Sequence, residues 1–288
     1  MGNGHPAEHD GRTRVSLPSD LLTLLACPEC RGSLAEDGLT LICAHCASRY
    51  PVTNGIPQLL PAVLAAGAPT DPAWKAWARA LDRLLAWRRR TWDGGVRAQT
   101  FQRAVSEIQA EFIRHCRLDE AQGSVLDVGC GSGEIAAALP VGCRYVGVDP
   151  LPLPGTSGLQ MIRGVGERLP FRVAAFDLVL VLETLDHCQS PNALMAEILR
   201  VLKPEGRLCV EQYVTAPRWR ERFPRLLRRY TAPGRPAPAD SAKVILLDAP
   251  DVRVLLESAF AEVRAGRASQ GSHVFLAARW RRDASGGS

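Results

Sequence analysis

Short apolar runs alternate with amphipathic stretches through the second half of the chain. Runs rich in Val, Leu, Ile and Phe predict strands at residues 124–128, 145–149, 176–182, 207–212 and 273–280. The sequence predicts helices at residues 134–139, 191–203 and 246–260. Strands that alternate with helices predict an α/β fold with a doubly wound, mostly parallel sheet, whose ligand binds at the carboxyl ends of the strands.

The helix predicted at residues 191–203 has the clearest local signals. Ser190 suits the N-cap position, and Pro191 suits the first helical position. Apolar side chains then recur on one face of the helix, as expected where a helix packs on a sheet. The Pro-Glu-Gly sequence at residues 204–206 predicts a turn into the next strand.

The nine cysteines are unevenly distributed. Cys27, Cys30, Cys43 and Cys46 form the pattern C-x2-C-x12-C-x2-C. Each C-x2-C pair brings two thiolates together in a tight turn, and two such turns complete the tetrahedral shell of a zinc ion. Four thiolates leave no open position for water or substrate, so the predicted zinc is structural. A hairpin with its turn at residues 36–38 is predicted between the pairs.

The other five cysteines stand singly in apolar surroundings and are interpreted as buried thiols. They are Cys116, Cys130, Cys143, Cys188 and Cys209.

The sequences that flank the paired cysteines carry a resemblance. LLTLLACP at residues 21–28 leads into the first pair, and YPVTNGIP at residues 50–57 follows the second. Residues 18–61 thereby resemble the small zinc-ribbon proteins that activate RNA- and protein-modifying methyltransferases in eukaryotes, and their short bacterial relatives. The resemblance implies that this zinc ribbon packs against a methyltransferase.

A glycine-rich turn follows the strand predicted at residues 124–128. Gly129, Gly131 and Gly133 allow the backbone to approach a ligand, and a turn from strand to helix aims free N–H groups at it. The dinucleotide fingerprint G-x-G-x-x-G would need glycine at Glu134, and no G-K-[ST] follows, so NAD binding and a P-loop are disfavoured. Asp149 ends the next strand, where a carboxylate can accept both ribose hydroxyls of an adenosine.

Residues 118–282 resemble class I S-adenosylmethionine-dependent methyltransferases, in particular the group that modifies ubiquinone and other small molecules. The resemblance rests on VLDVGCGSG, VGVD, GERLPF, FDLVLVLETLDH and EILRVLKPEGRL, which occur in the expected order. It implies a seven-stranded, Rossmann-like sheet that binds S-adenosylmethionine. The residues that it assigns to cofactor binding are Asp127, Gly129, Cys130, Gly131, Gly133, Asp149, Pro150, Gly166, Glu167, Leu182 and Glu183. Gly166 stands where the family usually has alanine.

Methyl transfer from a sulfonium is an in-line displacement whose leaving group is already activated by its positive charge. The enzyme therefore mainly aligns the reactants and excludes water, and it needs a base only where the acceptor arrives protonated. The catalytic candidates lie near the ends of the fourth and fifth strands of the family's sheet: Glu183, His187, Glu211 and Tyr213. His187 has the best intrinsic pKa for a base, although a histidine at this place also serves packing.

Residues 62–117 predict two amphipathic helices between the ribbon and the sheet. Their apolar stripes are Trp74, Trp77, Leu81 and Leu84, followed by Phe101, Val105, Ile108 and Phe112. An apolar stripe usually lies in a core, so the favoured interpretation is that both helices pack the ribbon onto the sheet. The alternative is a lid over the cofactor.

Composition restricts these interpretations only modestly. The 288 residues are 46% hydrophobic and 23% charged, which is typical of a folded globular protein. No apolar run approaches the ~18–20 residues that span a bilayer. The N-terminus lacks the apolar stretch of a secretory signal, so we expect a cytoplasmic protein. Disordered tails are expected at residues 1–17 and 283–288.

The acceptor is less well defined than the cofactor. The net charge is +5, and the concentrated basic segment, residues 217–230, holds six arginines inside an expected substrate-recognition insertion at residues 214–245. One short basic element is a small phosphate footprint, so methylation of an oxygen or nitrogen of a small metabolite is favoured. The alternatives are methylation of tRNA or rRNA through residues 218–229, and a non-catalytic scaffold that binds the cofactor for stability.

Overall fold

The computed structural model describes residues 17–65, 69–92, 96–151, 159–214, 235–236, 243, 245–269 and 273–280. The basic segment, most of the insertion and the expected tails, apart from Leu17, lie outside these residues. Within the described part of the chain, no helix is long and apolar enough to cross a membrane.

A seven-stranded sheet forms the centre of the molecule, with the strand order β12-β13-β9-β8-β5-β6-β7. Strands β7, β6, β5, β8 and β9 run parallel to one another, whereas β13 and β12 are antiparallel to their neighbours. The strands are β5 (Ser124–Val128), β6 (Arg144–Asp149), β7 (Gln160–Arg163), β8 (Phe176–Leu182), β9 (Leu202–Tyr213), β12 (Glu262–Arg267) and β13 (His273–Arg279). This topology confirms the predicted α/β fold with a doubly wound, mostly parallel sheet.

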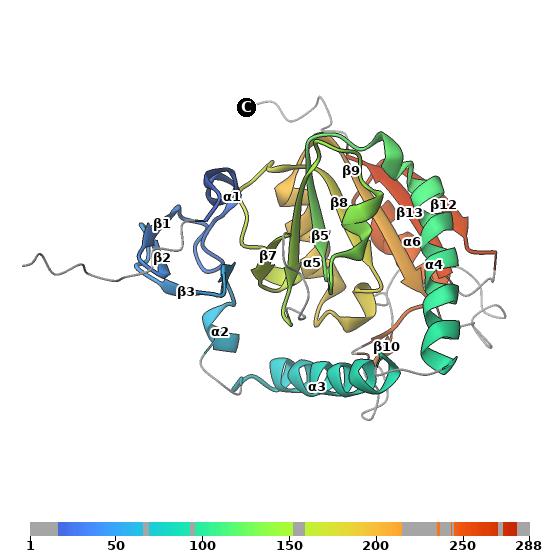
Figure 1. The fold of residues 1–288 in the computed structure, drawn as a ribbon, viewed down its shortest axis with the longest axis horizontal. Coiled ribbons are helices and arrows are strands. Elements are labelled where there is room, and N and C mark those ends of the chain that lie inside the picture. Colours follow the sequence, from blue (N-terminus) through green and yellow to red (C-terminus); the bar gives the residue numbers. More distant parts are fainter. Residues whose placement is uncertain are drawn as a thin grey trace, which may run out of the picture.

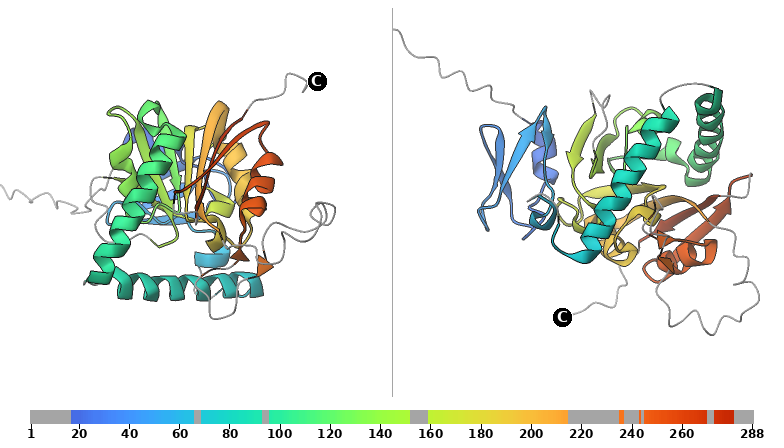
Figure 2. Two further views of the ribbon diagram at one scale, coloured as in Figure 1. Left: turned by 90° about the vertical axis from the view of Figure 1, so that its right-hand side faces the viewer. Right: turned by 90° about the horizontal axis from the view of Figure 1, so that it is seen from below.

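Both faces of the sheet are covered, because successive residues of a buried strand point to opposite sides. Val125 packs in a cluster with Ile108 and Phe112 of α4 (Val96–Cys116). The next residue, Leu126, belongs to a larger cluster on the other face, with side chains of α5 (Pro191–Val201) and α6 (Ala249–Glu257). Figure 2 shows α4 and α6 on opposite sides of the sheet.

Two predicted elements differ locally from the structure. The helix predicted at residues 134–139 is a short 3-10 helix, η2 (Glu134–Ala138), because Leu139 is already extended before Pro140. The turn predicted at residues 204–206 lies inside β9. There the pairing with β8 jumps from Leu202 to Arg207, and the extra residues form a bulge.

Helix α5 begins as predicted. The Ser190 side chain accepts a hydrogen bond from the backbone N–H of Ala193 at 3.2 Å, and Pro191 is the first helical residue. Helix α6 begins at a capping box in which Asp248 and Asp251 bond to each other's backbone N–H groups.

The N-terminal module consists of α1 (Ser19–Leu24) and four short antiparallel strands in sequential order. The strands are β1 (Leu34–Asp37), β2 (Thr40–Cys43), β3 (Arg49–Thr53) and β4 (Ile56–Pro57). The predicted hairpin is present, although its turn lies at residues 38–39. Gly38 has a φ of 62°, which glycine adopts without the penalty of a side chain.

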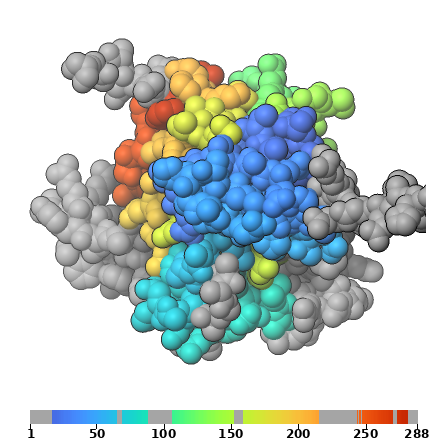
Figure 3. All heavy atoms as spheres, turned by 90° about the vertical axis from the view of Figure 1, so that its left-hand side faces the viewer, coloured from blue at the N-terminus to red at the C-terminus, as the bar shows by residue number. Residues whose placement is uncertain are grey.

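This module joins the β7 edge of the large sheet directly. Backbone N–H groups donate from Ala26 to the Pro170 carbonyl at 2.9 Å and from Leu59 to the Arg163 carbonyl at 2.8 Å. Leu25 and Leu59 are fully buried in one hydrophobic cluster with Phe171 of the sheet domain. In Figure 3 the blue module covers this side of the molecule.

Side chains reinforce the junction between module and sheet. Arg31 contacts Glu197 of α5 at 2.7 Å, and the same carboxylate pairs with Arg200 at 2.6 Å. Arg168 reaches Glu29 at 3.1 Å. The module therefore packs on the sheet through its own residues.

Helix α3 (Pro72–Trp92) follows the short α2 (Ala62–Ala65) and crosses the carboxyl ends of the parallel strands, as Figures 1 and 2 show. The favoured interpretation, that both linking helices pack the ribbon onto the sheet, fits α3 in part, because α3 clusters with Leu60 at the end of the ribbon and with Val165 of the sheet domain. Helix α4 covers the sheet, whereas Trp77 and Leu81 of α3 cluster with Val165 beside the strand ends. The stripe on α3 is thus the wall of a pocket.

Candidate active site and metal centre

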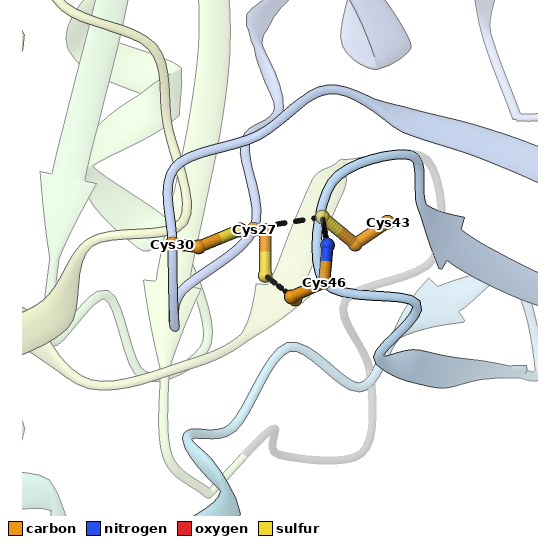
Figure 4. Close-up of side chains that lie close together, drawn as sticks. All are labelled: Cys27, Cys30, Cys43 and Cys46. Carbon is orange, nitrogen blue, oxygen red and sulfur yellow. Dashed lines mark hydrogen bonds between the residues drawn. The ribbon is translucent and has the colours of Figure 1, made fainter.

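Four cysteine side chains converge from two loops of the N-terminal module (Figure 4). The sulfur atoms lie 3.6 Å apart for Cys27 and Cys46 and 3.4 Å apart for Cys30 and Cys43. All four lie within 4.8 Å of one another. Tetrahedral zinc with Zn–S bonds of about 2.3 Å places sulfurs about 3.8 Å apart, so this donor set fits a structural zinc ion.

The two loops that carry these cysteines pack closely against each other. A Cβ on Gly32 would lie 2.8 Å from the Cβ of His45 and 3.0 Å from the Cys43 sulfur, so only glycine fits there. The backbone N–H groups of His45 and Cys46 point at the Cys43 sulfur at 3.4 and 3.5 Å. Such donors stabilise a thiolate, the form that binds metal.

A pocket of roughly 570 Å³ of empty space, open solvent included, lies at the carboxyl ends of β5, β6 and β8, beneath α3. Of the residues predicted to bind a cofactor, six line it: Gly129, Asp149, Pro150, Gly166, Glu167 and Glu183. Among the predicted catalytic residues, Glu183 and His187 line it.

Asp149 lies at the tip of β6, where the sequence predicts a ribose acceptor. One of its carboxylate oxygens accepts from the Gly131 N–H at 3.0 Å, and the other accepts from the Leu151 N–H at 2.7 Å. The bonds to the glycine-rich loop and to the chain after β6 fix the orientation of the carboxylate.

Gly129 sets the shape of the pocket floor. Its φ is 74°, and a Cβ there would lie 2.2 Å from the Thr184 hydroxyl. That hydroxyl is within hydrogen-bond distance of the Leu182 carbonyl, at 2.8 Å, and the Val128 carbonyl, at 3.1 Å. Thr184 therefore ties the end of β8 to the glycine-rich loop, a role that sequence reasoning missed.

Five predicted cofactor residues are not among those that line the pocket: Asp127, Cys130, Gly131, Gly133 and Leu182. Asp127 is 2% exposed and accepts a hydrogen bond from the Tyr145 hydroxyl at 2.8 Å. Burial raises the pKa of Asp127 to about 7. Asp127 thus holds the Tyr145 hydroxyl, which lies beside Gly133 of the glycine-rich loop.

Glu167 lines the pocket, but its carboxylate is already engaged. One oxygen accepts from the backbone N–H of Gln189 at 2.6 Å and of Ser190 at 3.3 Å. Burial raises the pKa of Glu167 above its usual value. Glu167 therefore joins the loop after β7 to the start of α5, and the adenine contact expected of it stays a prediction.

The far end of the pocket is acidic. Glu183 follows β8 with a φ of 50°, uncommon outside glycine, and its carboxylate accepts from the Tyr213 N–H. Although 43% of this side chain is open, the surrounding protein and the carboxylates of Asp186 and Glu211 raise the pKa of Glu183 to about 8. Burial raises the pKa of Glu211 to about 7.

His187 links helix α3, the lid over the pocket, to this end of the pocket. Its backbone carbonyl accepts the indole N–H of Trp77 at 2.9 Å, and its Nε2 lies 3.7 Å from Asp186. Glu211 and Tyr213, the other predicted catalytic residues, are not among those lining the pocket. They lie in β9 beside Glu183.

Two further residues at this end were missed by sequence reasoning. Lys243 forms an ion pair with Asp186 and lies 4.6 Å from the centre of the Tyr213 ring. His273 lies 3.6 Å from the Glu183 carboxylate, and burial together with nearby Lys243 lowers the pKa of His273. The position of His273 depends on which strand lies beside β9, which no local pattern reveals.

Taken together, the switch in strand order at β5 and the glycine-rich loop define an α/β domain of the nucleoside-binding class. The families that match the chain show which kind of domain each part is. Residues 126–210 match the family described as a methyltransferase domain, and residues 19–55 match the Trm112p-like proteins. The chain therefore carries a methyltransferase domain joined to a Trm112-like zinc-ribbon domain, in agreement with both resemblances.

Curated relatives match the second domain. A ubiquinone biosynthesis O-methyltransferase of Xanthomonas oryzae is 30% identical over 140 residues, which are 44% of this chain and 58% of that protein. An uncharacterized methyltransferase of Mycobacterium leprae is 40% identical over 92 residues, 28% of this chain and 34% of that protein. The chain thus spans less than two thirds of the length of these relatives.

Two solved structures share the fold. The 1,6-didemethyltoxoflavin-N1-methyltransferase of Burkholderia thailandensis, which holds its substrate and S-adenosylhomocysteine, has a TM-score of 0.52 at 20% identity and covers 75% of this chain and 94% of its own. A complex of the Haloferax volcanii Trm112 methyltransferase activator with a methyltransferase has a TM-score of 0.50 at 14% identity. The match covers 70% of this chain and 98% of that chain.

Proposed function

We propose that this protein transfers the methyl group of S-adenosylmethionine to an oxygen or nitrogen of a small metabolite. The observation that carries the proposal is one continuous pocket that extends over the ends of three neighbouring strands. Asp149 lies at the end of β6 on one side, Gly129 follows β5 in the middle, and Glu183 and His187 follow β8 on the other side. A nucleoside with a reactive side chain needs this arrangement if its reacting atom is to meet an acceptor.

The nucleoside end fits the cofactor. Asp149 lies in the pocket at the tip of β6, where a carboxylate can accept from two ribose hydroxyls, and the backbone N–H groups of Gly131 and Leu151 fix its orientation. Gly129 and Gly166 present backbone to the pocket where a side chain would collide, at Gly166 with Leu194 at 2.7 Å. S-adenosylmethionine supplies a methyl group on a positively charged sulfur, which leaves as a neutral thioether.

Side chains at the acceptor end can take a proton from the acceptor. Glu183 has a pKa near 8, so near neutral pH both of its protonation states are populated and it can take a proton from an acceptor hydroxyl or ammonium. His187 is a second candidate for this role. The acidic surroundings also attract the positive charge that develops where a nitrogen acceptor is methylated.

The lid favours a small acceptor. Trp77, Leu81 and Leu84 of α3 cover the pocket, so an acceptor must fit between this helix and the strand ends. Water is kept from the reacting atoms in the same way. The similarity to ubiquinone O-methyltransferases supports a small-molecule acceptor, and RNA methylation through residues 218–229 is the competing outcome of the test.

Calorimetry with S-adenosylhomocysteine tests the cofactor assignment. We expect binding of one molecule per chain, at least about tenfold weaker in Asp149→Ala, because two hydrogen bonds to a charged group contribute about 1.5–3 kcal/mol each. Asp119→Ala is the matched control, since Asp119 is exposed and lies in η1 (Leu118–Glu120), away from the pocket. Unchanged binding in Asp149→Ala would remove the basis of the proposal.

The acceptor is tested with labelled S-adenosylmethionine and separated metabolite and RNA fractions of a bacterial extract. Label in the metabolite fraction supports the proposed acceptor. Label confined to tRNA or rRNA replaces it with RNA methylation, and no transfer despite tight cofactor binding indicates the scaffold.

A further inference from the structure

Hydrogen-bond donors surround the cysteine centre of the N-terminal module. Four thiolates outweigh the charge of one Zn²⁺, so the loaded centre is negatively charged and needs such donors. The Cys43 sulfur faces the backbone N–H groups of His45 and Cys46. The backbone N–H of Gly32 acts on the Cys30 sulfur. These donors belong to the turns themselves and do not depend on which side chains the loops carry.

The other two sulfurs each contact a hydroxyl from the segment that leaves the second cysteine pair. The Ser48 Oγ lies 3.1 Å from the Cys46 sulfur. The Tyr50 Oη lies 3.1 Å from the Cys27 sulfur. A zinc-bound thiolate carries no proton, so in both contacts the hydroxyl donates and the sulfur accepts. Unlike the backbone donors, these two depend on the amino acid at one position.

The two contacts differ in their access to water. Cys46 is exposed, so water can solvate its sulfur as well. Cys27 is 0% exposed and Tyr50 is 5% exposed, because the alternation along β3 turns Tyr50 inward. A charge buried away from water depends on donors that the protein supplies. Backbone N–H groups of Glu29 and Cys30 also act on the Cys27 sulfur, and Tyr50 adds a side-chain donor to them.

We propose that Tyr50 is a positioning residue of the zinc centre. Its hydroxyl donates to the Cys27 thiolate, orients this ligand toward the metal and takes the place of water at a sulfur that water does not reach. The O–H···S bond draws electron density from the sulfur, which keeps the thiolate in the deprotonated form that binds zinc. Loss of an outer partner of a metal ligand typically weakens metal binding by about 10–100-fold.

The ligand that Tyr50 contacts lies directly beside the junction between the two domains. The residue before Cys27 is Ala26, whose N–H donates to the Pro170 carbonyl of the sheet domain at 2.9 Å. The bond from Tyr50 therefore fixes the zinc ligand that continues from the attached segment. The tyrosine of the YPVTNGIP sequence thus has a chemical role beyond its place in a strand.

Cobalt substitution tests the hydrogen bond in the full-length protein. Co²⁺ in a thiolate site absorbs light by charge transfer from sulfur to metal, and the energy of this band reports the electron density on the sulfurs. Tyr50→Phe keeps the ring and loses the donor, so we expect the band to move to lower energy. A tyrosine that only packs would lower the melting temperature without moving the band. An unmoved band in Tyr50→Phe overturns the proposal.

Transfer of zinc to a coloured chelator gives a second measurement. We expect Tyr50→Phe to release zinc at least about tenfold faster than the wild type. Ser48→Ala should change the rate little, because water can replace this hydroxyl at the exposed Cys46. Tyr145→Phe is the matched control, since it loses a hydroxyl bond to Asp127 in the other domain. Equal rates in Tyr50→Phe and in either of the other variants overturn the proposal.

Replacement of Tyr50 by 3-fluorotyrosine keeps the proposal testable if Tyr50→Phe does not fold around the metal. Fluorine makes the phenol a stronger hydrogen-bond donor while the ring and the hydroxyl remain. The charge-transfer band should then move to higher energy, and zinc release should become slower. A shift in the opposite direction, or none, overturns the proposal.

Discussion

Trp77 on α3 donates its indole N–H to the backbone carbonyl of His187 at 2.9 Å. This bond joins the lid to the segment that follows β8, where two catalytic candidates lie. Trp77 is only 6% exposed and packs edge-on against Trp74, with ring centres 5.2 Å apart. This directional contact, set in an apolar cluster, helps to hold α3 over the pocket.

Replacement of this contact should loosen the lid. Trp77→Phe keeps an aromatic ring but loses the donor, so S-adenosylhomocysteine should bind about two- to tenfold more weakly, equivalent to one hydrogen bond of about 0.5–1.5 kcal/mol. Trp87→Phe on the same helix is the control, because Trp87 is 41% exposed. Calorimetry measures both; equal affinities in the two variants would show that the lid does not depend on this bond.

The floor of the pocket is expected to tolerate no side chain at position 129. In Gly129→Ala the new Cβ would meet Thr184 at 2.2 Å, so the loop must move away from its place beside Asp149. We expect at least about tenfold weaker S-adenosylhomocysteine binding.

Gly142→Ala separates this steric effect from backbone strain. Gly142 also has a positive φ, of 98°, but nothing lies within 4 Å of its Cβ position. The strain should lower the melting temperature of this variant and leave its cofactor affinity unchanged. A similar loss of affinity in both variants would contradict the collision with Thr184.

Zinc removal should affect both domains. Cys27→Ser loses one thiolate, and elemental analysis should show that the usual one zinc per chain is lost or greatly reduced. Because Leu59 and Leu60 link the module to β7 and to the α3 cluster, S-adenosylhomocysteine binding should fall as well. Cys143→Ser, at a half-buried cysteine outside the module, is the control. Full cofactor affinity in a zinc-free Cys27→Ser protein would show that the domains are independent.

The buried Asp127 should make stability depend on pH. Its pKa is about 7 in the folded protein and ~3.9 when unfolded, so between these values the folded state binds more protons. Stability from this group is therefore complete below about pH 4 and is lost as the pH rises through 7, by up to a few kcal/mol.

Asp127→Asn cannot titrate and should lose this dependence. Urea unfolding of the wild type and of Asp127→Asn at pH 5 and pH 8 measures the difference between them. Asp119→Asn should follow the wild type, because Asp119 is exposed. Parallel curves for the wild type and Asp127→Asn would mean that Asp127 is ionised when folded.

The parts of the fold that follow from local patterns were predicted well. The strand at residues 176–182 has the predicted bounds, since a continuous apolar run admits little else in a buried sheet. The cap at Ser190 and the acid at Asp149 were also found from sequence. Strands β7 and β12 were missed, because one is four residues long and the other alternates weakly and lies at the sheet edge.

The sequence predicted those parts of the site that lie within one motif, but not the residues that the fold brings together from distant segments. His273 is far from Glu183 in the sequence and meets it through the order of strands. Lys243 is equally distant in the sequence from its partner Asp186. The pocket-lining role of α3 was only the alternative from sequence, because an apolar stripe that lines a pocket has the same spacing as one that packs in a core. Thr184 gave no signal beyond its place after a strand.

The attachment of the N-terminal module to β7 has a consequence for assembly. In the Haloferax volcanii complex the Trm112 activator and the methyltransferase are separate proteins, whereas here a Trm112-like domain and a methyltransferase domain lie in one chain. Tethering turns a bimolecular encounter into an intramolecular one, with an effective concentration on the order of millimolar for a short link. The outer edge of β7 is therefore occupied at any cellular abundance of the protein, and dilution does not release an exposed strand edge that could recruit other chains.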